Sequence, residues 1–151
     1  MTDSGIDSSV AILRALLTED FETYSRLNSE LDRSANKAFA AVLGAAFTEA
    51  VNRRFDDKPS PSEIITFVAN TRAAYERAGQ MVSAEDAEHM IRAALGEDHL
   101  VDNMTGHAMG TAQTAVLFAI VHDNGSSAGQ IDDLLKVAEA RASSYFRRNA
   151  R

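Results

Sequence analysis

The stretch Gly110-Thr-Ala-Gln-Thr-Ala-Val-Leu-Phe-Ala-Ile-Val121 decides the fold that we predict. It carries no charged residue, and the run from Ala115 to Val121 is entirely apolar. A helix that is apolar on every side has to be buried, because none of its faces can be left to water. The run is far shorter than the roughly 20 residues that a helix needs to cross a bilayer. We therefore predict a central helix that is covered either by the rest of the chain or by a second copy.

The segments around this stretch carry apolar residues at the three- and four-residue spacing of amphipathic helices. We predict these helices over residues 7–17, 18–31, 37–55, 60–78, 83–95 and 127–145, and a start for the central helix between Asp102 and Gly106. No strand pattern or internal repeat is present. The predicted fold class is therefore all-α, a bundle of about six to seven helices around the central one. Residues 1–6 are expected to be a flexible tail, and residues 7–151 a single domain.

Several helix boundaries have local signals. Ser60-Pro61-Ser62-Glu63 combines an N-cap serine, a first-turn proline and a glutamate in the capping-box position. Similar caps are expected at Thr18, Ser83 and Ser127, and glycine C-caps at Gly79 and Gly96. Between Asp32 and Asn36 no glycine or proline forces a stop, so a bend and a continuous helix both stay open there.

Glycines inside helices suggest places where another helix approaches closely. Gly44 costs about 1 kcal/mol relative to alanine, which is tolerable if a second helix crosses there. Gly106 and Gly110 lie four residues apart before the apolar run. No strand or lysine accompanies them, so they do not form a phosphate-binding loop. We expect them to allow close helix packing instead.

The composition restricts the classes of function. The chain has 151 residues and no cysteine, with 22 Asp and Glu against 15 Lys and Arg and a net charge of −7. The lack of cysteine excludes disulfides and thiolate metal sites. An acidic surface disfavours nucleic acid and anionic membranes as partners. The N-terminal residues lack the basic start and apolar core of a signal peptide, so a cytoplasmic location is expected.

Three patches resemble a known group of proteins. They are Phe47–Phe55 with Arg53-Arg54, Ile64-Ile65-Thr66-Phe67-Val68-Ala69, and Met90-Ile91-Arg92-Ala93-Ala94-Leu95-Gly96. Together they cover 22 of the 151 residues, and they resemble small all-helical uncharacterised actinobacterial proteins. The resemblance implies a helical fold, and it implies no activity and no site residue.

The segment Glu85–His107 holds the densest set of acidic residues and histidines. Asp86 and His89 share a helix face, so they are candidate ligands for a divalent metal, and we place a candidate pocket near Asp86, His89 and His99. The alternative is that these side chains form a solvated surface. Because the paired Glu-x-x-His of di-iron bundles and the two-histidine zinc motif are absent, we assign no metal ligand and no cofactor.

Other chemical patterns are weak. Serines lie at helix starts, and no nucleophile elbow is present, so no catalytic residue is assigned. His122-Asp123 lies where a helix C-terminus favours a cation. Residues 60–95 hold two helices joined by a turn, but the second begins with Glu85 and Asp86. These carboxylates would face phosphates, so we reject a DNA-recognition helix.

Three hypotheses about function follow. The favoured one is a non-enzymatic protein-interaction or self-associating module, of which a homodimer is one form, because the alanine-rich helical surface exceeds what short helices cover. The second is a small-molecule or divalent-metal-binding protein, or an enzyme, with its pocket near Asp86, His89 and His99. The third is an acidic partner for a basic protein.

Overall fold

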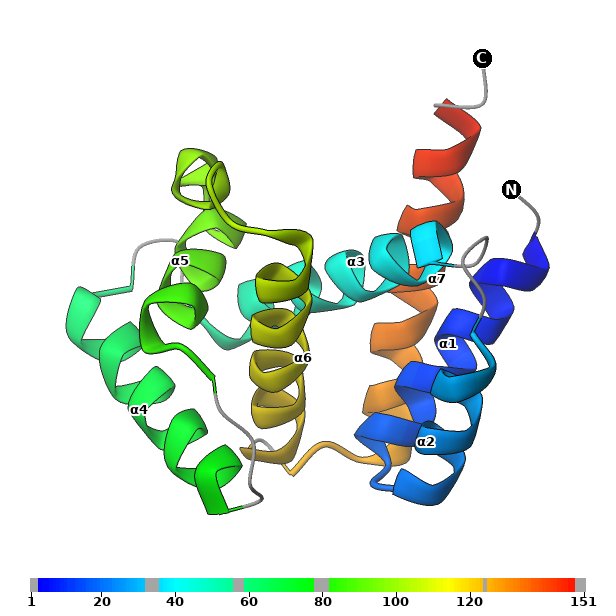
Figure 1. The fold of residues 1–151 in the computed structure, drawn as a ribbon, viewed down its shortest axis with the longest axis horizontal. Helices are drawn as coiled ribbons and strands as arrows, with labels where there is room; N and C mark the ends of the chain where they lie inside the picture. Colours follow the sequence, from blue (N-terminus) through cyan, green and yellow to red (C-terminus); the bar gives the residue numbers. More distant parts are fainter. Residues whose placement is uncertain (1–2, 32–35, 56–58, 78–81, 124, 149–151) are drawn as a thin grey trace. The chain divides into compact units, whose positions relative to one another are not determined.

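A computed structural model of the chain describes residues 3–31, 36–55, 59–77, 82–123 and 125–148 (Figure 1). Within these ranges it contains α-helices, one 3-10 helix and no strand, which confirms the all-α fold class. The elements are α1 (Asp3–Leu17), α2 (Phe21–Glu30), α3 (Asn36–Arg54), α4 (Pro61–Arg77), α5 (Ala84–Ala94), the 3-10 helix η2 (Asp98–Val101), α6 (Gly106–Asp123) and α7 (Ala128–Arg148). No helix in the described ranges has the length and apolar character needed to cross a bilayer.

The helices group into two compact units. The first unit comprises residues 1–49 and 121–151, and the second comprises residues 50–120. The first thus holds α1, α2, most of α3 and α7, and the second holds α4, α5, η2 and most of α6. A single domain over residues 7–151 stays a prediction.

In the first unit, α1 packs against both α2 and α7. The buried residues of α7 recur at helical spacing, so that helix presents one apolar face and one polar face; they are Ile131, Leu134, Leu135, Ala138 and Ala142. An ion pair between Arg14 and Asp132 joins α1 to α7, and Arg141 pairs with Glu49 of α3 at 2.8 Å. The ion pairs are partly exposed, so packing of the apolar faces supplies most of the stability.

The first helix begins earlier than predicted. Its first residue is Asp3, and Ile6 is only 3% exposed, so the predicted flexible tail is wrong for residues 3–6. Ile6, Val10 and Leu13 follow one another at steps of four and three, so the buried stripe starts inside the predicted tail. The buried Ser9 hydroxyl donates a hydrogen bond to the Gly5 carbonyl at 2.8 Å, which fixes the first turns.

The second helix differs from the prediction at both ends. Asp20, and not Thr18, is its N-cap and accepts a hydrogen bond from the Thr23 amide at 3.3 Å. The Thr18 hydroxyl instead donates to the Arg14 carbonyl in α1. At the other end Leu31 has extended backbone, so α2 stops there and a helix that continues through to Asn36 is excluded. Residues 32–35 of the predicted bend lie outside the described ranges.

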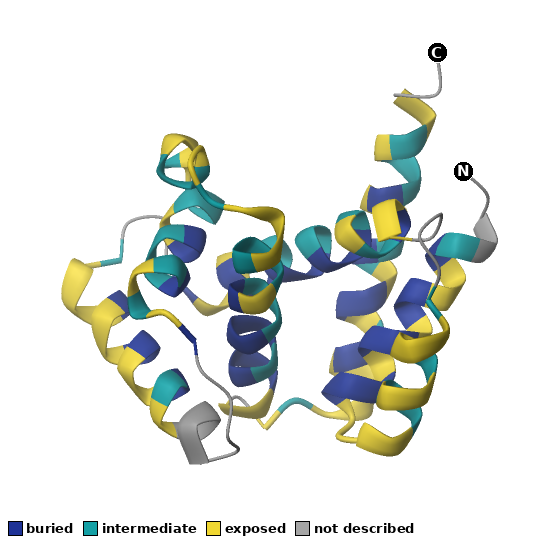
Figure 2. Cartoon of the chain, in the orientation of Figure 1, coloured by how far each residue is buried: buried dark blue, intermediate teal, exposed yellow. Residues whose placement is uncertain are grey.

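The apolar stripe of α2 is covered only in part. None of its residues is buried, and Phe21 at its start is 52% exposed (Figure 2). This helix lies against α1 without contributing to the buried core.

In the second unit, α4 packs against α5, and η2 lies against the end of α5. Two of the predicted N-caps are confirmed here. Ser60 accepts a hydrogen bond from the Glu63 amide at 3.2 Å, and Ser83 accepts one from the Asp86 amide at 3.2 Å. The predicted linker of residues 97–105 contains η2, and the predicted C-cap Gly79 lies outside the described ranges.

The central helix α6 matches the prediction over most of its length. Every residue from Ala112 to Val121 is buried or half-buried, although Thr111 is exposed (Figure 2). A single chain therefore covers this segment, and no second copy is needed for its burial. After α6, Gly125 has a φ of +59°, in the left-handed region that favours glycine. The predicted box at Ser127 is also confirmed, because its side chain and that of Gln130 each accept the other residue's backbone amide.

The expectation for Gly106 and Gly110 is wrong. A Cβ atom added at either position would meet no atom of the described residues within 4 Å outside its own helix, so no described helix approaches them closely. The four-residue spacing allows an approach, but the fold places no described neighbour there.

Gly110→Ala is accordingly expected to stabilise the protein by about 0.5–1 kcal/mol, because alanine restricts the unfolded chain and meets no clash in the helix. Urea denaturation followed by circular dichroism measures this change. Gly125→Ala is the matched control and is expected to destabilise, since its φ is +59°. A destabilised Gly110→Ala variant would contradict the open space around this residue.

Candidate functional site

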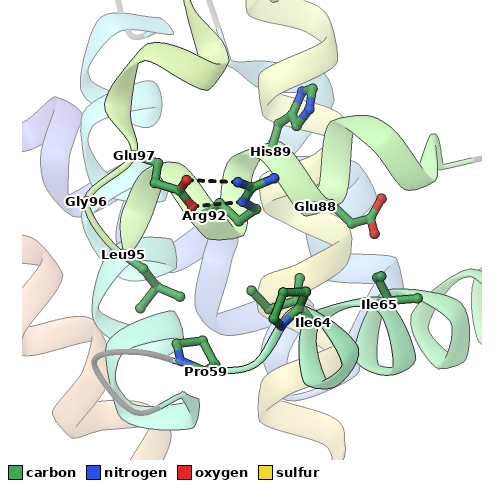
Figure 3. Close-up of a pocket in the computed structure, with 10 residues that line it drawn as sticks. Pro59, Ile64, Ile65, Glu88, His89, Arg92, Leu95, Gly96 and Glu97 are labelled. Carbon is green, nitrogen blue, oxygen red and sulfur yellow. Dashed lines mark hydrogen bonds and ion pairs between the residues drawn. The ribbon is translucent and has the colours of Figure 1, made fainter.

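The second unit carries a groove between the start of α4 and the end of α5 (Figure 3). Its volume is about 610 Å³. Its lining residues are Pro59, Pro61, Ile64, Ile65, Glu88, His89, Arg92, Leu95, Gly96 and Glu97. One wall is thus formed by apolar side chains of α4 and the residues before it, and the other carries the charged side chains of α5.

The α4 wall follows from the local sequence. The Ser60 cap and Pro61 start the helix at a fixed point, so Ile64 and Ile65 fall in its first two turns. Neighbouring residues in a helix point about 100° apart, so only one of the two can face the core. Ile64 is 6% exposed and Ile65 is 55% exposed. Ile65 therefore offers an apolar side chain to solvent at the groove.

The α5 wall ends in a Schellman motif. The Gly96 amide donates to the Ala93 carbonyl at 3.1 Å, and the Glu97 amide donates to the Arg92 carbonyl at 3.0 Å. Gly96 has a φ of +123°, which favours glycine at this position. The turn brings Glu97 back beside the last turn of α5, so its side chain reaches Arg92.

Arg92 and Glu97 form a two-pronged ion pair (Figure 3). Arg92 Nε donates to Glu97 Oε2 and Nη2 donates to Oε1, both at 2.8 Å. The hydrogen bonds from Arg92 lower the pKa of Glu97, and those to Glu97 raise the pKa of Arg92. Glu88 raises the pKa of Arg92 further through its negative charge. Two glutamates against one arginine leave the lining acidic.

The ion pair predicts a titration behaviour for Glu97. Its pKa is lowered in the folded protein, so the contribution of the pair is complete above the unfolded pKa and is lost as pH falls through the folded pKa. Arg92→Ala is expected to return the pKa of Glu97 towards its ordinary value, which NMR titration of the side-chain carboxyl measures. Arg147→Ala removes an exposed cation from α7 and is the control. An unchanged Glu97 pKa in Arg92→Ala would show that the pair does not form.

The structure brings only one of the three predicted pocket residues to the groove. His89 lines it. Asp86 and His99 are not among its lining residues; Asp86 lies in the first turn of α5, and His99 is exposed in η2. Among the residues that the structure describes, no three His, Asp or Glu side chains lie close enough together to hold a metal ion. The candidate set Asp86, His89 and His99 is therefore not assembled as a metal site.

The sequence reasoning missed the exposed Ile65 and the Arg92–Glu97 pair. A signal for each was present. Two adjacent isoleucines at a capped helix start imply that one of them faces away from the core. A glycine after the last helical turn implies a Schellman return, which places the residue after Gly96 near Arg92.

The chain was compared with protein-family models, with curated proteins and with solved structures. Nothing matched in any of the three comparisons, so the resemblance to helical actinobacterial proteins stays a prediction from the residues alone.

Proposed function

We propose that the chain is a non-enzymatic protein-interaction module whose docking site is the groove between α4 and α5. The observation that supports this proposal is Ile65, which is 55% exposed beside the half-buried Leu95 and Pro59 that also line the groove. Burying a fully exposed isoleucine contributes about 1.5–3 kcal/mol, so the 55% exposed Ile65 can contribute roughly half of that as one anchor of a weak complex.

The charges around the groove favour one kind of partner. Glu88 and Glu97 line it, and Glu63 in the first turn of α4 is exposed. Arg92 already donates to Glu97, so its charge is largely compensated. A protein segment that combines an apolar side chain with flanking Lys or Arg complements this arrangement. We propose such a basic protein segment, and not nucleic acid, as the partner of this acidic chain in the cytoplasm.

Capture from native lysate tests the docking site. The wild-type chain is immobilised beside Ile65→Glu, which places a carboxylate on the groove, and beside Thr66→Glu as control. Thr66 is also exposed on α4 and does not line the groove. We expect the wild-type chain and the Thr66→Glu variant to capture the same proteins. We expect the Ile65→Glu variant not to capture them. Equal capture by all three would contradict it, and circular dichroism of each variant verifies that it is folded.

A second candidate function is the binding of a small molecule in the same groove. Its volume of about 610 Å³ lies within the range of ligand pockets, and His89 adds a polar ring to an otherwise apolar and ionic lining. Chemical shifts of Ile65 and His89 in the presence of a fragment library measure such binding. Changes in chemical shift confined to Ile65 and His89 would favour the small-molecule function. If no fragment changes these shifts, only the protein-docking function remains proposed for the groove.

A further inference from the structure

The last two turns of α7 carry a surface that is complementary to the groove. Arg141, Tyr145 and Arg148 are separated by four and three residues, so they share one face of the helix. We call this set the arginine–tyrosine face. Tyr145 is 50% exposed, Arg148 is exposed, and the Arg141 side chain is 51% exposed although it pairs with Glu49 at 2.8 Å. A large ring thus lies between Arg148 and Arg141, and the carboxylate of Glu49 largely compensates the charge of Arg141.

The charge pattern distinguishes this face from the other exposed apolar residues. The large apolar side chains exposed in the described ranges are Phe21, Ile65 and Tyr145. Phe21 lies beside Asp20 and Glu22, so its surroundings carry the same sign of charge as the groove. Tyr145, whose ring also contacts that of Phe146, has the exposed cation Arg148 one turn away on its own helix face. Of the three, it is the side chain that an apolar groove with an acidic lining attracts.

The two surfaces also agree in length. Arg141 and Arg148 are seven residues apart, which is about 10 Å along a helix. Glu88 and Leu95 lie at opposite ends of the groove in Figure 3, and they are also seven residues apart along α5 and its cap. Two helical turns of α7 are therefore about as long as the part of α5 that lines the groove.

We propose that the arginine–tyrosine face of one copy docks in the α4–α5 groove of a second copy, so that the chain assembles head to tail. This inference rests on the proposed docking function of the groove and names its occupant. The two contacting surfaces differ, so each added copy leaves one groove and one face open. The assembly grows with concentration, as a closed ring or as an open chain of copies.

Sedimentation velocity over a series of concentrations tests this assembly. The weight-average mass of the wild-type chain is expected to rise above the monomer mass as the concentration increases, and to fall in high salt because the charges are screened. Ile65→Glu, the groove variant, and Tyr145→Ala/Arg148→Ala, the face variant, are each expected to weaken association about tenfold or more. Thr66→Glu and Arg147→Ala alter neighbouring exposed positions on the same helices and are expected to associate as wild type does.

Mixing the two variants gives the decisive result. The groove variant keeps an intact face, and the face variant keeps an intact groove. Each alone is expected to be monomeric, whereas the equimolar mixture forms one-to-one dimers that cannot grow further. A monomeric mixture, a monomeric wild type at high micromolar concentration, or wild-type association that neither variant weakens would overturn the proposal. A monomeric wild type whose lysate partners are still lost with Ile65→Glu would overturn the head-to-tail assembly and leave the docking function standing.

Discussion

Ala115→Glu is expected to destabilise the chain by several kcal/mol, a large part of the roughly 5–15 kcal/mol that holds a typical domain folded. Ala115 is 1% exposed, and its neighbours Val116 and Leu117 are fully buried. A carboxylate at this position has to leave water, and burying a charge is costly. The loss is expected to shrink at acidic pH, because protonation removes the buried charge.

Urea denaturation of Ala115→Glu, compared with Thr111→Glu, measures this effect. Thr111 lies one turn earlier in α6 and is exposed, so the same new charge remains in water there. The Thr111 variant is expected to stay within about 0.5 kcal/mol of wild type. If Ala115→Glu kept wild-type stability and altered only the association state, α6 would be covered by a second copy and not by its own chain.

Phe47→Ala is expected to cost about 3–5 kcal/mol, since it removes a large ring and leaves a cavity. Phe47 is 1% exposed in α3 and is the largest fully buried side chain in the described ranges. Phe21→Ala is the matched control, because it removes the same atoms from a ring that is 52% exposed. The control is expected to cost less than about 1 kcal/mol.

Thermal and urea unfolding of both phenylalanine variants give the comparison directly. A similar loss in the two would contradict the assignment of Phe47 to the core and of Phe21 to the surface. If only Phe47→Ala loses much stability, substitutions at exposed positions leave the chain folded. The variants at exposed groove and face positions such as Ile65 are then expected to change binding without unfolding the chain.

The sequence predicts those features that depend on local chemistry. The starts of α4, α5 and α7 follow from serine side chains that accept amide hydrogen bonds within their own first turn. The burial of α6 follows from the lack of any polar face between Ala115 and Val121. These interactions span a few residues, so no knowledge of the tertiary fold is needed to find them.

Features that depend on distant segments are not predicted. The spacing of Gly106 and Gly110 permits a close helix contact, but only the packing decides whether a helix lies opposite, and no described atom does. The groove likewise requires α4 and α5 to lie side by side, and the sequence pattern is satisfied by several helix arrangements. His89 lines the groove, whereas Asp86 and His99 lie near His89 in the sequence and do not line the groove.

The partial covering of α2 has a consequence for how the first unit opens. Hydrogen exchange and proteolysis sample local openings whose free energies range from near zero up to that of global unfolding. Because α2 contains no buried residue, releasing it exposes little apolar surface, while α1 and α7 keep their shared apolar faces. The backbone amides of α2 thus exchange through a small, local opening, and those at the α1–α7 contact exchange only when the unit unfolds as a whole.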